Sequence, residues 1–166
     1  IAVKAALTGH LVLSTLHTND APSTINRLMN MGIEPFLVAS SVNLICAQRL
    51  VRRICTKCKQ PHPLPLQALL DVGFTEEEAA GTTPMKGTGC QACNNTGYKG
   101  RQGVYEVMVL TPGLRDLILD RASATALKRL ALSEGMRTLR IDAISKLKRG
   151  LTTAEEVLKE TAADNV

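Results

Sequence analysis

The sequence predicts an α/β fold that carries an inserted metal-binding loop. Two runs of apolar and β-branched residues, at 9–16 and 103–110, have the length of strands and no helical periodicity. Several other segments place apolar residues three and four positions apart, which is typical of helices packed on one face. Two Cys-x2-Cys pairs lie between the two runs. A chain of 166 residues is long enough for one ordinary domain, or for a domain with a small appendage.

In the first part of the chain, residues 9–16 (Gly-His-Leu-Val-Leu-Ser-Thr-Leu) are expected to form a buried strand. Turn-forming and capping residues follow at 17–22, and they predict the start of a helix over 23–31. Gly32 directly follows the last apolar position of this helix and is expected to end it.

A second helix is predicted to begin at Pro35, a residue that suits the first helical turn, and to run to about Ala47. Its apolar side nearly encircles it, so we expect Cys46 on this helix to be a small buried side chain. Residues 50–54 alternate weakly between apolar and basic, which indicates a strand near a sheet edge that leads to Cys55.

The composition changes between residues 55 and 93, where prolines, glycines and three consecutive glutamates replace the apolar pattern. We interpret this stretch as an inserted loop module with one short helix at 66–72. A strand at 103–110 follows, closed by Thr-Pro-Gly. The remaining chain is predicted to form four helices, at residues 114–120, 124–133, 138–149 and 154–160. Thr152 or Thr153, with Glu155 or Glu156, provides a capping box for the last of them.

The overall composition excludes several classes of protein. With 45% hydrophobic and 21% charged residues, the chain is neither disordered nor of low complexity. No apolar run approaches the roughly 20 residues of a membrane-spanning helix, and no signal peptide is recognisable. The chain starts with Ile1 rather than Met, so we expect it to be a piece of a longer protein.

The charge of the chain does not assign a partner. The formal net charge of +5 would fall to +3 if four cysteines were thiolates on one zinc ion. Aromatic residues make up only 2% of the chain, which argues against binding of single-stranded nucleic acid by base stacking.

The strongest chemical signal is a set of four cysteines. Cys55 and Cys58 form one pair, Cys90 and Cys93 form the other, and 31 residues separate the pairs. Two residues between cysteines allow both sulfurs to bind one cation, and two such pairs complete a tetrahedral four-thiolate site of the structural kind. The glycines around the second pair suit tight turns whose backbone N–H groups bond to thiolates. The set therefore predicts a structural zinc site.

Disulfides or a redox-active pair are the alternatives to zinc. Disulfides require an oxidising compartment, for which the sequence gives no secretion signal. A single redox motif would leave the matched second pair unexplained. Zinc is therefore the favoured interpretation.

Two histidines stand near the two ends of the predicted strand at 9–16. On a strand His10 and His17 would lie roughly 23 Å apart, too far to share one metal ion. Residues 17–20 come just after the carboxyl end of that strand, which is where α/β sheets place their active sites. His17 is therefore a candidate functional residue, and His10 a weaker one; the alternative for both is a hydrogen-bonded structural histidine.

The order of motifs along the chain closely resembles the secretion ATPases of type II secretion and type IV pilus assembly. The resemblance covers almost the whole chain. It rests on residues 5–10 (Ala-Ala-Leu-Thr-Gly-His), 16–21 (Leu-His-Thr-Asn-Asp-Ala), 47–55 (Ala-Gln-Arg-Leu-Val-Arg-Arg-Ile-Cys), the two cysteine pairs, and 97–106 (Gly-Tyr-Lys-Gly-Arg-x-Gly-x-Tyr-Glu). The four cysteines favour the assembly and secretion branch over the pilus-retraction ATPases, which generally lack them.

The resemblance implies the C-terminal half of a RecA-like ATPase domain. Residues 1–54 would be part of the ATPase core, 55–93 the tetracysteine zinc-binding insertion, 94–110 a core strand region and 111–166 a C-terminal helical subdomain. The family's phosphate loop, Gly-x4-Gly-Lys-Ser/Thr, is absent from this chain, as is the acidic strand that binds Mg²⁺. The resemblance therefore implies that ATP and Mg²⁺ bind through an upstream half, and that this chain is inactive alone.

The resemblance also implies roles for individual residues. In the family the Gly-His to Leu-His-Thr segment is the His box, on the γ-phosphate side of the ATP site. His17 would thus sense or polarise the γ-phosphate and the attacking water, with support from Thr15 and His10. Arg101 resembles the position that packs on the nucleotide base, where a guanidinium can stack; the alternative is a solvated basic loop.

As partners, the resemblance implies a homohexameric ring and a platform protein of the bacterial inner membrane. The protein would act at the cytoplasmic face of that membrane without spanning it, and no nucleic acid is expected. Three arginines (Arg49, Arg52, Arg53) could line a subunit contact or form a solvated strand face. The competing hypothesis is a zinc-stabilised module that binds nucleic acid or protein without catalysis, which leaves the histidine segment unexplained.

Overall fold

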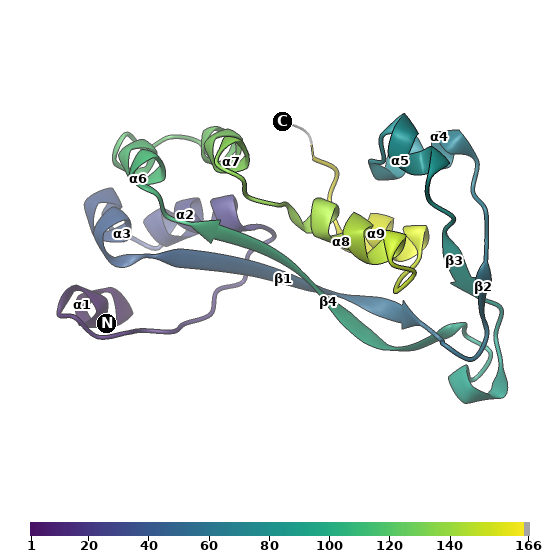
Figure 1. The fold of residues 1–166 in the computed structure, drawn as a ribbon. Helices are drawn as coiled ribbons and strands as arrows, with labels where there is room; N and C mark the ends of the chain where they lie inside the picture. Colours follow the sequence, from purple (N-terminus) through teal and green to yellow (C-terminus); the bar gives the residue numbers. More distant parts are fainter. Residues whose placement is uncertain (165–166) are drawn as a thin grey trace. The chain divides into compact units, whose positions relative to one another are not determined.

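The computed structural model describes residues 1–164, which divide into two compact units. The first unit contains Ile1–Ala47 and Glu106–Arg137, and the second contains Gln48–Tyr105 and residues 138–164. Two long strands, β1 (Leu44–Ile54) and β4 (Tyr98–Val109), contribute residues to both units and pair as a two-stranded sheet (Figure 1). Residues 165–166, the end of the predicted subdomain at 111–166, lie outside the described part of the chain.

Strands β1 and β4 run in opposite directions. Leu110 N donates to Asn43 O at one end of the pair, and Cys55 N donates to Gly97 O at the other, both at 3.0 Å. Buried and exposed residues alternate along the second half of β4, as expected for a ribbon with one covered face. The predicted strands at 50–54 and 103–110 are confirmed, and both are longer than predicted.

The first unit packs helices against one another. Its helices are α1 (Ala2–Leu7), α2 (Ala21–Asn30), α3 (Pro35–Ser41), α6 (Pro112–Leu119) and α7 (Ala124–Ser133). Helix α3 contacts α6, and α2 contacts α7. The side chains of Ile25, Val38, Leu114 and Leu127 are fully buried in this unit. The helices predicted at 23–31, 114–120 and 124–133 are therefore confirmed.

The predicted strand at 9–16 is wrong for the structure described here. Residues 10–18 have no regular structure, and the side chains of Leu11 and Leu13 are each 89% exposed. A strand needs a neighbour to accept its backbone hydrogen bonds, and the described sheets contain only the pairs β1–β4 and β2–β3. Residues 9–16 thus have the length and composition of a strand, but no described strand lies beside them to pair with.

The predicted helix from Pro35 to Ala47 is also corrected, because α3 ends at Ser41. The hydroxyls of Ser40 and Ser41 donate to the carbonyls four residues earlier, Phe36 O and Leu37 O, and the following backbone is extended. Residues 44–47 join β1 instead, since pairing with β4 satisfies their backbone groups. Cys46 consequently lies on a strand and is exposed, contrary to the prediction that it is buried.

The second unit contains the cysteine pairs and the last two helices. It includes β2 (Lys59–Pro61), α4 (Leu66–Val72), α5 (Glu76–Ala80), β3 (Met85–Gly87), a 3-10 turn η1 (Gln91–Cys93), α8 (Leu139–Lys148) and α9 (Ala154–Glu160). The helices predicted at 66–72, 138–149 and 154–160 are confirmed. The run of three glutamates, which was not predicted to be helical, forms α5. Thr75 and Glu78 form a capping box at the start of this helix.

Arg140 is a buried cation that joins three helices of the second unit. Its guanidinium donates to Val72 O (2.9 Å) at the end of α4, and to Thr161 O (2.8 Å) and Thr161 Oγ1 (2.7 Å) just after α9. The residue is only 6% exposed. Because buried carbonyls without a donor are costly, this one side chain satisfies groups that the helix ends leave open.

Replacing Arg140 with alanine is expected to lower the free energy of unfolding by roughly 3 kcal/mol. The change removes three hydrogen bonds and leaves two buried carbonyls without a donor. Chemical denaturation followed by circular dichroism measures the change. Arg149→Ala is the matched control, because Arg149 is an exposed arginine at the end of the same helix. Equal stability of the two variants would contradict the assigned role.

Among the described residues, no helix is both long and apolar enough to cross a lipid bilayer.

Candidate functional site

The structure brings the four predicted metal ligands together. The sulfurs of Cys55, Cys58, Cys90 and Cys93 all lie within 4.8 Å of one another, so they could hold one metal ion. Neighbouring sulfurs are 3.7–3.8 Å apart, and all four cysteines are free thiols. A disulfide would need sulfurs at about 2.05 Å, so the predicted alternative of two disulfides is not the arrangement seen.

Local chain geometry explains how these sulfurs converge. Cys55 immediately follows β1, and Cys58 immediately precedes β2. Strand β2 pairs antiparallel with β3, with Lys59 opposite Gly87, which returns the chain to Cys90. Cys90 is the N-cap of the 3-10 turn that ends at Cys93.

Backbone amides act on the sulfurs as the sequence predicts. Cys93 is buried, which opposes ionisation, but the N–H groups of Cys90 and Gly97 each donate to its Sγ at 3.2 Å and lower its pKa to about 6. The backbone N–H of Lys57 similarly lowers the pKa of Cys55. Burial raises the pKa of Cys58 to about 11. Backbone donors thus favour the thiolate, the form that binds metal, at two of the four sulfurs.

Glycine is required at position 97, where the backbone passes close to Gly87. The φ of Gly97 is +78°, and a Cβ placed there would lie 2.6 Å from Gly87 O. Only glycine therefore allows the backbone approach that aims the Gly97 N–H at Cys93.

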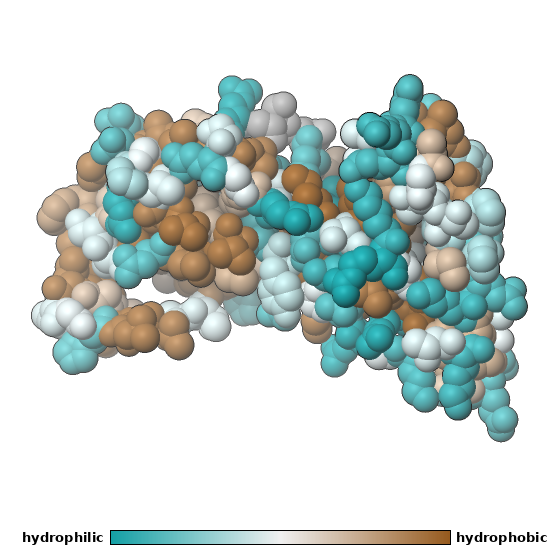
Figure 2. Space-filling model, in the orientation of Figure 1, coloured by the Kyte–Doolittle hydropathy of each residue, from teal (hydrophilic) through white to brown (hydrophobic). Residues whose placement is uncertain are grey.

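The four cysteines form a small buried cluster of their own. The buried cluster consists of Cys55, Cys58 and Cys93, with Cys90 packed against it. The surface around the 3-10 turn is mainly hydrophilic (Figure 2), and Gln91, Asn94 and Asn95 are exposed. Within residues 55–93 the larger buried apolar side chains are on and near α4, namely Leu69, Val72 and Phe74. Little apolar burial is available around the cysteines, so the turns that carry them need another source of stability.

The candidate histidine segment lies in the first unit. His10, Thr15 and His17 are all exposed. His10 Nδ1 is 3.1 Å from Thr8 Oγ1, just after α1. The segment ends at Asp20, the N-cap of α2, whose carboxylate accepts from Ser23 N at 2.8 Å.

Glu106 anchors the residues that follow His17. Its carboxylate is buried in the middle of β4 and accepts from Ala21 N, the first residue of α2, at 2.9 Å. A carboxylate at a helix N-terminus is electrostatically favourable. Thr18 Oγ1 and Thr24 Oγ1 are also 2.8 Å apart, so two contacts fix the chain directly after His17.

Glu106 and Glu156 are both buried acids. From the sequence, Glu106 was given no functional role, and Glu156 was considered only as a member of the capping box of the last helix. The signal for Glu106 was available, because a lone acid inside an apolar strand is costly unless it has a partner. Glu156 carried no comparable signal, since a glutamate in the first turn of a helix is ordinary. Arg101 lies exposed on β4 in the second unit.

Comparison with protein families identifies relatives of this chain. Residues 1–159 match the profile of the family described as "Type II/IV secretion system protein". The chain is 53% identical over 165 residues to the type IV pilus assembly ATPase PilB of Myxococcus xanthus, and 47% identical over 164 residues to PilB of Thermus thermophilus. It is 44% identical over 164 residues to type II secretion system protein E of Aeromonas hydrophila.

These matches use nearly all of this chain but only part of each relative. They cover 99%, 97% and 99% of the chain, and 29%, 18% and 32% of the three relatives, respectively. Among solved structures, a crystal structure of the pilus retraction motor PilT with bound ADP matches with a TM-score of 0.62 at 22% identity. It covers 98% of this chain and 36% of the other. This last likeness concerns the fold, and it supports the α/β class.

Proposed function

Because the chain belongs to the type II/IV secretion system protein family, we propose that it is part of an ATP-hydrolysing motor for type IV pilus assembly or type II protein secretion. The observation that carries the proposal is similarity along 97–99% of the chain to proteins named for these two functions. Both systems remain within the proposal, since relatives from each are similarly close.

The proposed fold is the C-terminal half of a RecA-like ATPase domain with a zinc-binding insertion and a helical subdomain. ATP and Mg²⁺ would bind mainly through the rest of the protein, because this chain has no phosphate loop. The apolar run at 9–16 would then pair with strands of that part, which would cover Leu11 and Leu13. The likeness in fold to a pilus motor supports this reading.

We further propose that the four cysteines hold zinc. Four sulfurs placed tetrahedrally at about 2.3 Å from one zinc ion lie about 3.8 Å from each other. The neighbouring sulfur distances of 3.7–3.8 Å fit this requirement. When bound, zinc would supply the stability that apolar burial does not provide here.

Within the motor, His17 would face the γ-phosphate and the attacking water, with Thr15 and His10 in support. Phosphoryl transfer depends on positioned donors near developing charge, which an imidazole N–H can provide. The contacts of Glu106 and Asp20 with the start of α2 would hold this segment in place. Arg101 would contribute a planar guanidinium to the nucleotide base.

The motor would be a homohexamer that acts on a platform protein at the cytoplasmic face of the inner membrane. A ring of identical subunits is the ordinary closed form of a head-to-tail assembly.

The test is ATP turnover by the full-length protein, with its mass in solution measured by light scattering. We expect turnover by a six-subunit species, and none by residues 1–166 alone. A full-length protein that binds no ATP and has no ATPase activity would overturn the proposal.

A further inference from the structure

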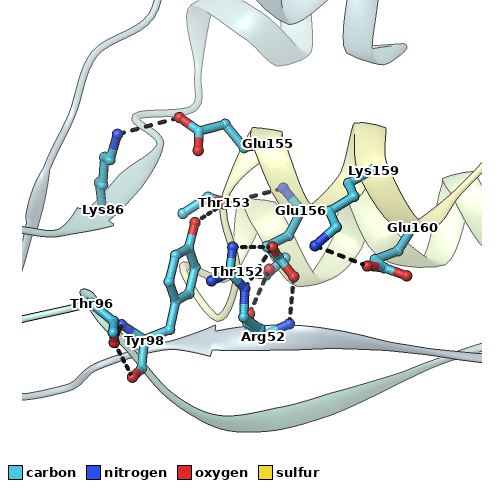
Figure 3. A network of polar contacts seen from close by, with 10 residues as sticks. All are labelled: Arg52, Lys86, Thr96, Tyr98, Thr152, Thr153, Glu155, Glu156, Lys159 and Glu160. Carbon is cyan, nitrogen blue, oxygen red and sulfur yellow. Dashed lines mark hydrogen bonds and ion pairs between the residues drawn. The ribbon is translucent and has the colours of Figure 1, made fainter. Parts of the chain in front are cut away.

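The segment between α8 and α9 holds the end of β1 in place (Figure 3). Ile54 N donates to Leu151 O at 2.9 Å, and Thr152 Oγ1 donates to Arg52 O at 2.9 Å. The last residues of β1 are therefore held by residues about 100 positions away in the sequence. Cys55 is the next residue of the chain.

Glu156 makes the strongest of these connections. One carboxylate oxygen accepts from Arg52 N at 2.7 Å, and the other accepts from Arg52 Nε at 2.9 Å and lies 2.8 Å from Nη2. The Glu156 side chain is only 2% exposed. The Arg52 guanidinium lowers the pKa of this carboxyl against the opposing effect of burial. The Arg52 side chain is 50% exposed, so solvent weakens the ion pair, but the bond from Arg52 N to the buried carboxylate holds the strand backbone directly.

The same short segment also contacts β4, which follows Cys93, and β3, which precedes Cys90. Thr153 Oγ1 is 2.8 Å from the hydroxyl of Tyr98, the first residue of β4, and the Arg52 guanidinium stacks 4.0 Å above the Tyr98 ring. Lys86 of β3 pairs with Glu155 at 3.3 Å. Figure 3 shows these side chains converging on the start of α9. The segment thus holds the strand that leads to Cys55 and the strand that follows Cys93, whereas the exposed pair of Lys86 and Glu155 adds little.

We propose that Glu156 is a positioning residue for the metal centre, acting through Arg52 and the end of β1. This inference rests on the proposed metal at the four cysteines. The carboxylate fixes the backbone of Arg52, three residues before Cys55, and the ring stack extends the same restraint to Tyr98, five residues after Cys93. Groups that orient the ligand residues change the metal affinity even though they do not contact the ion.

The coupling is reciprocal. If docking of α9 onto Arg52 favours the arrangement that binds metal, metal binding favours docking of α9 by the same factor. Loss of metal is therefore expected to weaken the docking of α9 on β1 by the same factor.

The experiment measures how fast zinc leaves the purified full-length protein for an excess of a coloured chelator, below the unfolding temperature. Glu156→Gln is expected to release zinc about tenfold faster, the lower end of the effect of outer ligand-orienting groups. Arg52→Lys keeps the charge but loses the planar guanidinium, so it should change the rate in the same direction. It also keeps the test decisive if Glu156→Gln does not fold.

Two controls on the same helix separate positioning from general destabilisation. Val157→Ala removes buried apolar contact and leaves the carboxylate in place, while Glu160→Gln alters a surface pair with Lys159. Both should release zinc at the wild-type rate. The inference is overturned if Glu156→Gln and Arg52→Lys match wild type, or if Val157→Ala accelerates release as much at equal loss of stability. Wild-type protein without about one zinc per chain would instead overturn the metal assignment and the inference with it.

Discussion

Replacing Cys90 with serine should loosen the cysteine-bearing turns at residues 55–58 and 90–97 while leaving the first unit intact. Four-thiolate zinc sites supply about 10 kcal/mol or more of folding free energy, so losing one ligand should weaken zinc binding by roughly 100-fold or more. The cysteines form their own buried cluster, so little else would hold the turns at residues 55–58 and 90–97. Hydrogen exchange of residues 55–97, together with the zinc content, measures the effect.

Cys46→Ser is the matched control for this substitution. Cys46 is an exposed cysteine on β1, outside the group of four. It should retain one zinc per chain and wild-type exchange. If Cys90→Ser protein kept full protection in a strong chelator, metal would not be what stabilises the module.

The pH dependence of zinc binding follows from the thiols. Metal binding displaces protons from the cysteines, so zinc affinity should fall as the pH is lowered. Cys58, whose pKa burial raises to about 11, is protonated at neutral pH in the metal-free protein and must give up its proton to bind. A competition titration between pH 6 and pH 8 is expected to show tighter binding at the higher value.

Replacing His17 with alanine is expected to abolish most ATP turnover by the full-length protein. Loss of one positioned donor at a site of developing charge typically costs about 100-fold or more in rate. Nucleotide binding should persist, because this chain has no phosphate loop and the rest of the protein would make those contacts. Steady-state turnover and nucleotide affinity are measured side by side.

His62→Ala provides the comparison. His62 is also an exposed histidine, on the chain just after β2 in the second unit. Its replacement should leave turnover unchanged. Unchanged turnover in His17→Ala would make His17 a structural residue and remove the proposed active-site role of residues 9–17.

Local sequence patterns were sufficient for the cysteine site and for most helices. Two residues between cysteines already fix the geometry within each pair, and the structure places all four sulfurs together. Helix α7 begins after Ser123 and α9 after Thr153, where a side-chain oxygen accepts from the third following backbone N–H. These signals act over a few residues, so they can be recognised without knowing the rest of the chain.

The predicted capping box at the start of α9 illustrates the limit of local reasoning. Thr153 caps the helix as predicted, but the carboxylate of Glu156 binds Arg52 instead of completing a local box. The two residues are 104 positions apart, and no short-range pattern relates them.

Strand formation depended on partners in the same way. Residues 44–47 have an apolar pattern compatible with a helix, and they became a strand because β4 lies beside them. Residues 9–16 have a pattern compatible with a strand and form none, because no described strand pairs with them. Helices satisfy their backbone hydrogen bonds within one segment, whereas strands and buried ion pairs require a second segment that only folding brings close.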